Sequence, residues 1–359
     1  MKSILLASTA VIALAGAAAA EVSFGGSATL GFNNNTIGND GFYWDAGVSV
    51  TLSQTLDNGI TASATFDVSI FSNSLASNVT GSGLVLSLVA PNAGLYFGDT
   101  AFAAETHWAS AGDMENDGFS LAGGETAIRG DMSFGSVDVS VSSVLADKTG
   151  APNAVADLNQ LSLGMTAAFG SFNVALAYQE ASGEAAGFYG ANGDWNDAEI
   201  FGLSVGTSFS GADVTFAYAS NVTAGENSIG IKVAYPVGPV TLTGYYVAES
   251  LALAPATGDN WGINAAYANG PIAVALDFQN DQGTEIWSLE GSYDVGNGLT
   301  VMAGVADSGD DYYVAGAYDL GGGAALLVSY ADDQTLDSGD AVGDPEYQNG
   351  TTVELSFAF

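Results

Sequence analysis

The sequence contains no cysteine, only four lysine and arginine residues, and a single histidine, His107. Without cysteine, the chain cannot use the disulfide framework that stabilises many small secreted domains. The few cations stand against 40 acidic residues, which give a formal net charge of −36 at pH 7. Because binding to nucleic-acid phosphates requires a basic surface, this composition excludes a nucleic-acid partner.

Long apolar runs are also missing, except at the N-terminus. Residues 1–20 begin with the cation Lys2, continue with an apolar stretch and end in small residues up to Ala20. This order is typical of a secretory signal peptide that is cleaved before Glu21. We therefore expect residues 21–359 to form the mature protein. No other segment has the stretch of about 18 apolar residues that a transmembrane helix needs.

Short amphipathic segments make up most of the mature chain. Apolar and polar residues alternate in pieces such as VTLTGYYV at 240–247 and the final TTVELSFAF. This is the period-2 pattern of a strand with one apolar face, and up to 20 segments are candidate strands. The charged side chains in them, including Asp67, Lys232 and Asp277, fall on the polar parity.

Two kinds of connection separate these segments. Nine tight links predict hairpins in which Gly or Asn adopts a positive φ angle; they lie at 57–59, 91–92, 135, 170, 210–211, 236–239, 269–270, 296–298 and 321–323. The connections at the other end are longer, polar and acidic, at 33–41, 72–82, 101–125, 146–157, 181–197 and 331–350. Short periplasmic turns and long extracellular loops are typical of outer-membrane barrels.

The pattern predicts an all-β fold, a transmembrane antiparallel up-and-down β-barrel with an even number of strands. Every backbone group inside hydrocarbon must be paired, so we expect the final strand to close the barrel against the start near Glu21. The charged parity then faces an aqueous lumen, because a carboxylate on the lipid face is costly. A soluble two-layer sandwich is the alternative, but it leaves the small, polar opposite faces unexplained.

Several stretches resemble one known family. The start EVSFGGSATLGF, the hairpin LSQTLDNGITASATF, the stretch AGLYFGDTAF before a long acidic loop, the run SYDVGNGLTVMAGVAD and the terminal Phe are similar to general diffusion porins of alphaproteobacteria. The resemblance implies 16 strands, a homotrimer in outer-membrane lipid, and a third loop at 100–125 that folds inward and narrows the pore. It also implies that Phe359 is the signal recognised by the barrel assembly machinery.

On this resemblance, acidic residues of the inward loop and charged residues near it line the pore constriction. Family members place several arginines opposite the acidic loop, whereas here only Arg129 and Lys232 fall on the inward parity, so we expect a weak or one-sided transverse field. The segment GDMENDG at 112–118 lacks the spacing of a calcium loop. No cofactor is assigned, and weak calcium binding at the acidic loops stays open. The predicted constriction residues are Asp99, Glu105, Asp113, Glu115, Asp117, Glu125, Arg129, Asp131 and Lys232.

These features predict a water-filled channel for passive diffusion of small hydrophilic solutes and ions, with a preference for cations. The alternative is a substrate-selective channel, for example for sugars, in which lumen side chains bind the solute; Tyr245 and Met302 fall on the polar parity but are isolated. An exported β-rich adhesin is a third class, and it would extract without detergent. We predict no enzyme, because a hydrolase needs a nucleophile, a base and an orienting group in contact.

Overall fold

The computed structural model describes residues 20–35, 41–72, 80–121, 126–146, 159–183, 196–250, 258–306, 311–332 and 347–359. These ranges contain 20 strands and the short helix α1 (Ala103–His107). No helix among them is long and apolar enough to cross a membrane. The strands are β1 (Glu21–Asn33), β2 (Gly41–Thr55), β3 (Thr61–Ser72), β4 (Thr80–Ala90), β5 (Ala93–Gly98), β6 (Thr126–Phe134), β7 (Val137–Ala146), β8 (Asn159–Phe169), β9 (Phe172–Gln179), β10 (Ile200–Phe209), β11 (Ala212–Asn221), β12 (Glu226–Val237), β13 (Val240–Ser250), β14 (Asn260–Asn269), β15 (Ile272–Asp281), β16 (Thr284–Gly296), β17 (Leu299–Ala306), β18 (Asp311–Gly321), β19 (Ala324–Asp332) and β20 (Gly350–Ala358).

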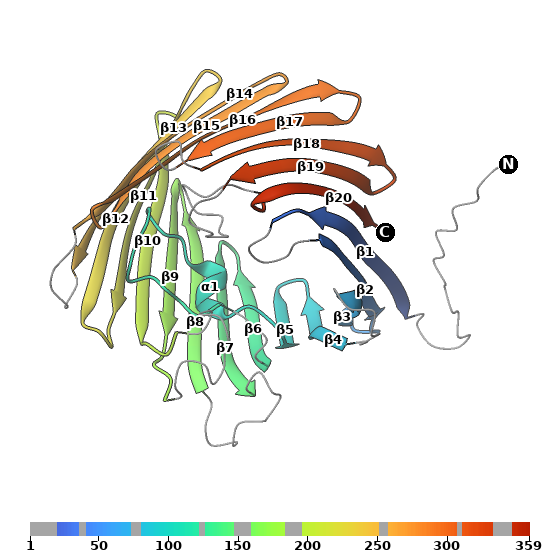
Figure 1. The fold of residues 1–359 in the computed structure, drawn as a ribbon. Coiled ribbons are helices and arrows are strands. Elements are labelled where there is room, and N and C mark those ends of the chain that lie inside the picture. Colours follow the sequence, from blue (N-terminus) through green and yellow to red (C-terminus); the bar gives the residue numbers. More distant parts are fainter. Residues whose placement is uncertain are drawn as a thin grey trace.

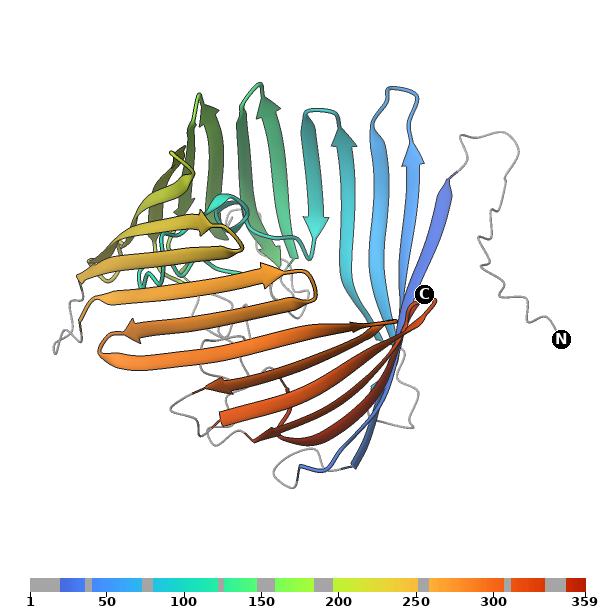
Figure 2. The same ribbon diagram turned by 90° about the horizontal axis from the view of Figure 1, so that it is seen from above.

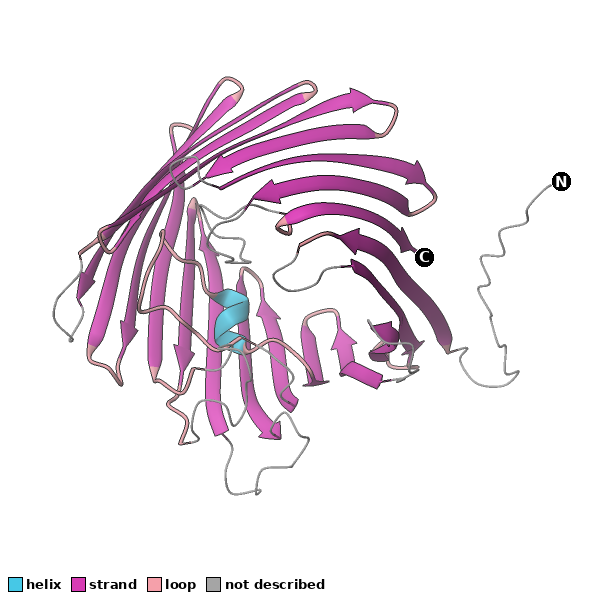
Figure 3. Ribbon diagram, in the orientation of Figure 1, coloured by secondary structure: helices cyan, strands magenta, loops and turns pink. Residues whose placement is uncertain are grey.

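All 20 strands form a single antiparallel sheet that closes on itself (Figures 1 and 3). Each strand pairs with the next along the chain, and β20 pairs with β1. Figure 2, turned by 90°, shows successive hairpins side by side along the wall. The predicted all-β barrel with an even strand number is confirmed. The sandwich alternative is wrong, because one continuous sheet forms instead of two packed layers.

The strand number differs from the family-based expectation of 16, which is wrong: the barrel has 20 strands. The segments counted from the alternating pattern gave the correct number. All nine tight links join consecutive strands, and most use a residue with positive φ, for example Gly135 (64°) and Gly270 (58°). The link at 91–92 does not, because proline fixes φ at a negative value and Asn92 is not in the left-handed region.

The strand ends that flank the longer connections lie at the opposite end of the barrel, which we call the long-loop end. This end is less uniform than predicted, because the connections at 222–225 and 282–283 are also short turns. The predicted signal peptide at 1–20 lies outside the described residues except for Ala20.

Alternation along each strand separates an apolar outer surface from a polar inner one. In β12, Ile229 is 57% exposed on the outer face, whereas its neighbour Ser228 is fully buried beneath a loop on the inner face. The acidic residues of the strands also follow the predicted parity. Glu354 accepts a hydrogen bond from Tyr43 (2.6 Å) and Asp277 accepts one from Asn264 (2.6 Å), both across the inner wall. The apolar surface therefore faces outward, as a membrane barrel requires.

The seam joins β1 to β20, as predicted, and it begins a few residues after Glu21. Seven residue pairs run from Ser27 opposite Ala358 to Asn33 opposite Thr352. Phe359 extends the pairing by exchanging backbone hydrogen bonds with Gly26 (2.8 and 3.2 Å). The first residues after Glu21 thus lie beyond the seam and pair with β2 alone. Closure involves the second half of β1, because the strands are tilted and staggered in a barrel.

Candidate constriction inside the barrel

One connection leaves the rim of the barrel. Residues 99–121, between β5 and β6, turn inward against the inner wall; we call this segment the inner loop (Figure 1). Its helix α1 contacts β7, β8 and β9. The backbone N–H of Ala103 donates to Ser142 Oγ (2.9 Å), and that of Ala104 donates to Ser162 Oγ (2.8 Å). Side-chain hydroxyls of the wall thus satisfy the free N–H groups at the start of the helix.

Small residues on the inner wall give the inner loop room to dock. A Cβ atom on Gly230 would lie 2.7 Å from the carbonyl oxygen of Ala111, closer than real Cβ contacts allow. Gly164 lies still closer beneath α1, and Gly202 lies still closer beneath the ring of Trp108. On β8 to β12, some of the small residues on the polar parity therefore make space for a loop that occupies the lumen.

An arginine anchors the beginning of the inner loop. Arg129 on β6 donates from Nη1 to the carbonyl oxygen of Ala101 (2.9 Å), and its guanidinium lies 4.7 Å from the centre of the Tyr96 ring. Its Nε is 3.0 Å from Asp131 Oδ1, and the side chain is only 12% exposed. Arg129 therefore contacts three partners. Because Asp131 largely balances its charge, Arg129 contributes little to the electric field in the lumen.

The neighbouring acidic residues of the inner loop have local roles. The Glu105 carboxylate accepts a hydrogen bond from the N–H of Phe102 (3.3 Å), which stabilises the start of α1. The backbone N–H of Asp99 donates to the carbonyl oxygen of Leu84 (2.9 Å), which holds the inner loop to the wall where it leaves β5.

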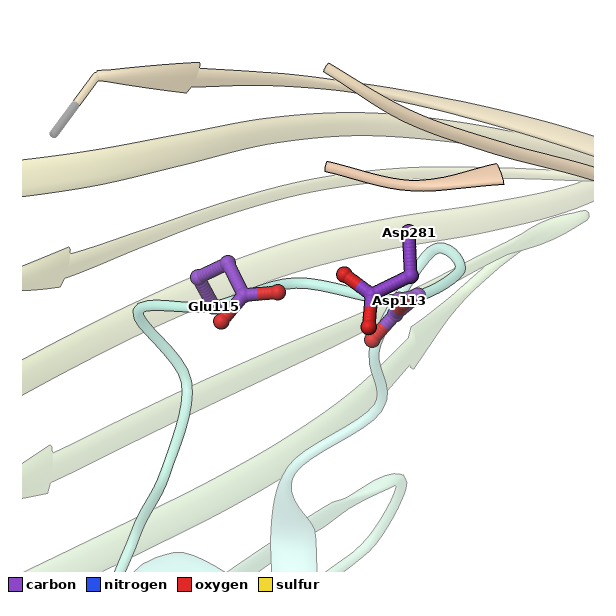
Figure 4. Close-up of side chains that lie close together, drawn as sticks. All are labelled: Asp113, Glu115 and Asp281. Carbon is purple, nitrogen blue, oxygen red and sulfur yellow. The ribbon is translucent and has the colours of Figure 1, made fainter. Parts of the chain in front are cut away.

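Three carboxylates converge at the tip of the inner loop. Asp113 and Glu115 come from the inner loop and Asp281 from the end of β15, and an oxygen of each lies within 4.8 Å of the other two (Figure 4). Asn260 holds the tip by donating from Nδ2 to the carbonyl oxygen of Asp113 (3.1 Å) and to Glu115 Oε1 (3.0 Å). Such oxygens are the ligands that hard cations prefer.

A fourth carboxylate, Glu249 at the end of β13, fixes the tip from the wall. It accepts hydrogen bonds from the N–H of Glu115 (3.1 Å), from Asn116 Nδ2 (3.2 Å) and from Ser228 Oγ (2.6 Å). We call Asp113, Glu115, Glu249 and Asp281 the acidic cluster. Its negative charges repel one another, so the hydrogen bonds from Asn116, Ser228 and Asn260 offset part of the electrostatic cost of holding them together.

Burial and neighbouring charge raise the pKa of two inner-loop carboxyls. The pKa of Asp113 rises to about 6, first because of burial and then because of Asp281 and Glu115. Burial also raises the pKa of Asp117 to about 6, although the hydrogen bond from Trp108 Nε1 (2.9 Å) opposes the rise. Near neutral pH both groups are therefore mostly ionised, and mild acidification protonates them.

His107, at the end of α1, belongs to the docking contacts. Its Nε2 lies 2.8 Å from Ser140 Oγ and its Nδ1 lies 3.3 Å from Thr166 Oγ1. Burial lowers the pKa of the imidazole, with Asp131 and Asp138 opposing the shift. A neutral imidazole can donate to one hydroxyl and accept from the other, so both ring nitrogens are satisfied by the wall.

Comparison with known proteins identifies the family. The sequence matches the family model described as Gram-negative porin over residues 7–338. The chain belongs to the Gram-negative porin family. No curated protein matches it. A triple mutant of Rhodopseudomonas blastica porin is similar to this porin with a TM-score of 0.50 and 16% identity, over 75% of this chain and 98% of that chain. A double mutant has a TM-score of 0.51, with the same identity and coverage.

At this identity, the structural similarity supports the barrel fold alone. The family consists of channel proteins, and no catalytic arrangement is indicated by it.

The structure distributes the predicted constriction residues over three places. Asp113 and Glu115 join the acidic cluster, and Asp117 lies next to it along the inner loop. Asp99, Glu105, Arg129 and Asp131 lie where the inner loop begins. Lys232 projects from β12, in register with Thr215 and Tyr245, and forms no ion pair among the described residues. Glu125 lies outside the described residues, and Phe359 closes the seam.

Two carboxylates of the acidic cluster were not predicted from the sequence. Glu249 and Asp281 lie at the long-loop ends of β13 and β15. Their position could have been a signal, because a charged residue at this end and on the inner parity faces any loop that folds inward. The lumen residues Tyr245 and Met302 were described as isolated, which is wrong. Tyr245 packs against Gly112 of the inner loop, and Met302 contacts Tyr347.

Proposed function

We propose that this porin is a water-filled, cation-preferring channel for passive diffusion of small hydrophilic solutes and ions across the outer membrane. The observation that carries the proposal is the charge balance around the inner loop. The acidic cluster and Asp117 contribute five carboxylates, whereas the cation nearest the start of the inner loop, Arg129, is paired with Asp131. Among the described residues, Lys232 is the cation of the lumen wall without an ion pair.

The physical basis is the electrostatic interaction of a permeating ion with the lining. A cation at about 4 Å from a carboxylate gains roughly 1 kcal/mol in bulk water and more at the lower effective dielectric of a protein surface. A gain of ~1 kcal/mol already enriches cations about fivefold over the bulk, and it excludes anions by a similar factor. The preference should weaken at high salt, because the Debye length falls from about 10 Å at 0.1 M to about 3 Å at 1 M.

Reversal potentials in a salt gradient across a planar bilayer test this function. We expect cation preference in the wild type, and a clear reduction when Asp113, Glu115 and Asp281 are all changed to Asn or Gln. The matched control is Asp57→Asn, which removes a carboxylate from an exposed turn at the opposite end. Anion preference in the wild type would refute the proposal. Saturable current that a sugar blocks would instead indicate a substrate-selective channel.

The same proposal includes export and assembly. We infer that residues 1–20 are removed as a signal peptide, that short turns face the periplasm, that the protein is a homotrimer in outer-membrane lipid, and that Phe359 is recognised by the barrel assembly machinery. The family resemblance supports these points. N-terminal sequencing of the protein isolated from outer membranes tests cleavage at Glu21, and native mass spectrometry in detergent tests the trimer.

A further inference from the structure

The inner wall of β17 to β19 departs from the polar character of the rest of the lumen. Met302, Tyr313 and Leu327 all lie on the inward parity and form one apolar cluster with Ala315 and Ala331. Tyr313 is only 5% exposed, and Ala331 is fully buried. A water-filled lumen would leave an apolar wall exposed, so burial here shows that something covers it from the inside.

Tyr347 covers this apolar cluster. Its ring centre lies 4.9 Å from that of Tyr313 at an angle of 55°, and its hydroxyl is 3.3 Å from Met302 Sδ. The ring thus packs against one aromatic side chain in a tilted geometry and contacts a thioether, both of which are favourable. Because Tyr313 and Met302 point into the lumen, Tyr347 must lie on the lumen side of the wall.

The chain beside Tyr347 is fixed to the barrel seam. Asn33 Nδ2 donates to the carbonyl oxygen of Asn349 (3.1 Å) and to Thr352 Oγ1 (2.8 Å), and the Asn33 side chain is buried. The next residue after Asn33 adds a further contact, because the N–H of Thr351 donates to Asn34 Oδ1 (2.6 Å). Contacts to β1 and to the apolar cluster therefore hold the segment 347–352 at both ends, and Tyr347 has a defined position.

This position lies across the barrel from the helix of the inner loop. In a closed ring of 20 strands in sequence order, the strand opposite β8 is ten places further on, which is β18. Helix α1 docks on β7 to β9, and Tyr347 docks on β17 and β18. Ser162, which binds α1, is the fourth residue of β8, and Tyr313 is the third residue of β18, so both contacts lie near the long-loop end.

We propose that Tyr347 forms a second wall of the constriction, so that the open passage lies between α1 on one side and this tyrosine on the other. The inference rests on the proposed channel function. Tyr347 carries no charge at neutral pH. It therefore sets the width of the passage, whereas the acidic cluster sets the preference for cations.

Removing the ring tests the proposal. Single-channel conductance of Tyr347→Ala should rise by a factor of roughly 1.2 to 1.5, because one side chain leaves part of the cross-section. Neutral polyethylene glycols that the wild type excludes should enter, while the reversal potential stays unchanged. The conservative variant Tyr347→Phe keeps the ring and should restore the wild-type exclusion size. Tyr330→Ala removes a tyrosine from the outer face of β19 and serves as the matched control.

A chemical measurement complements conductance, since the chain has no cysteine of its own. Met302→Cys should react slowly with a charged, water-soluble thiol reagent while Tyr347 covers it, and at least about tenfold faster in combination with Tyr347→Ala. Wild-type conductance together with fast labelling of the single variant would overturn the inference, as would an unchanged exclusion size in Tyr347→Ala. A wild type without any conductance would instead reject the proposed channel function.

Discussion

Helix α1 should leave the barrel wall when a single methyl group is added beneath it. A Cβ on Gly164 would meet the carbonyl oxygen of Ala103 first, and it would lie 2.5 Å from His107 Cδ2, whereas ordinary contact begins at 3.4 Å. The helix must therefore retreat by at least about 0.9 Å, the difference between 3.4 and 2.5 Å, because the Ala103 oxygen lies closer still. This movement stretches the hydrogen bond from Ala104 to Ser162 from 2.8 Å to at least about 3.7 Å, beyond hydrogen-bond range.

The energetic consequence follows from the hydrogen bonds that are lost. The bond from Ala103 to Ser142 stretches by the same amount, and each such bond is worth roughly 1 kcal/mol. A loss of about 2 kcal/mol raises the population of the undocked inner loop about 30-fold. The barrel itself should remain folded, because Gly164 lies within a strand that is paired on both sides.

Conductance of single channels measures this effect. Gly164→Ala should show noisier current and more frequent high-conductance events than the wild type. Gly206→Ala provides the matched control, because a Cβ at this inward position on β10 meets its nearest atom at 3.8 Å, an ordinary contact. Retention of the compact, heat-modifiable form on gels establishes that both variants fold. If the current of Gly164→Ala is as quiet as that of Gly206→Ala, docking of α1 against Gly164 does not control the pore.

Three further outcomes follow from the arrangement of charge and from the seam. Cation preference should fall as pH drops through about 6, because Asp113 and Asp117 gain protons there and lose their negative charge. Reversal potentials at pH 7.5 and 5 measure this change. Replacing both residues by Asn should abolish the pH dependence. Arg129→Gln should make the single-channel current noisy, because the substitution removes the hydrogen bond to Ala101. Lys232→Gln should leave the current quiet and strengthen the cation preference. Similar effects of the two substitutions would contradict the anchoring role of Arg129. Deleting Phe359 should lower the amount of folded protein in the outer membrane, because it removes the proposed recognition signal and the hydrogen bonds to Gly26. Wild-type amounts on immunoblots of membrane fractions would argue against it.

The strands could be predicted from the sequence because their signals are local. A period of two residues separates lipid-facing Ile229 from lumen-facing Ser228, and glycines such as Gly135 mark the turns. The number of strands was correct when counted from these signals and wrong when taken from the resemblance. A barrel can gain hairpins without changing the local pattern of the others, so similarity to a family does not fix its size.

The constriction could be predicted only in part, because it depends on contacts between distant segments. The acidity of the inner loop was visible in Asp113 and Glu115, but their neighbours Glu249 and Asp281 come from strands more than 130 residues further along. A lumen-facing arginine with a free charge also cannot be distinguished, from sequence alone, from one that is paired with a carboxylate. Contacts with Tyr96 and Asp131 hold Arg129 against the wall, where it anchors the inner loop and does not act as a free charge in the pore.

Because β1 pairs with β20, the sheet is either completely closed or has two unpaired edges. Until these two strands meet, β1 and β20 each present a row of unpaired backbone groups, and in hydrocarbon each such group costs several kcal/mol. A sheet that lacks one hairpin and cannot close is thus not a narrower pore, because its unpaired edges make insertion into the bilayer unfavourable. Completing the circle and entering the membrane must be coupled events, and truncated or nicked chains should be degraded before they can make the cell envelope leaky.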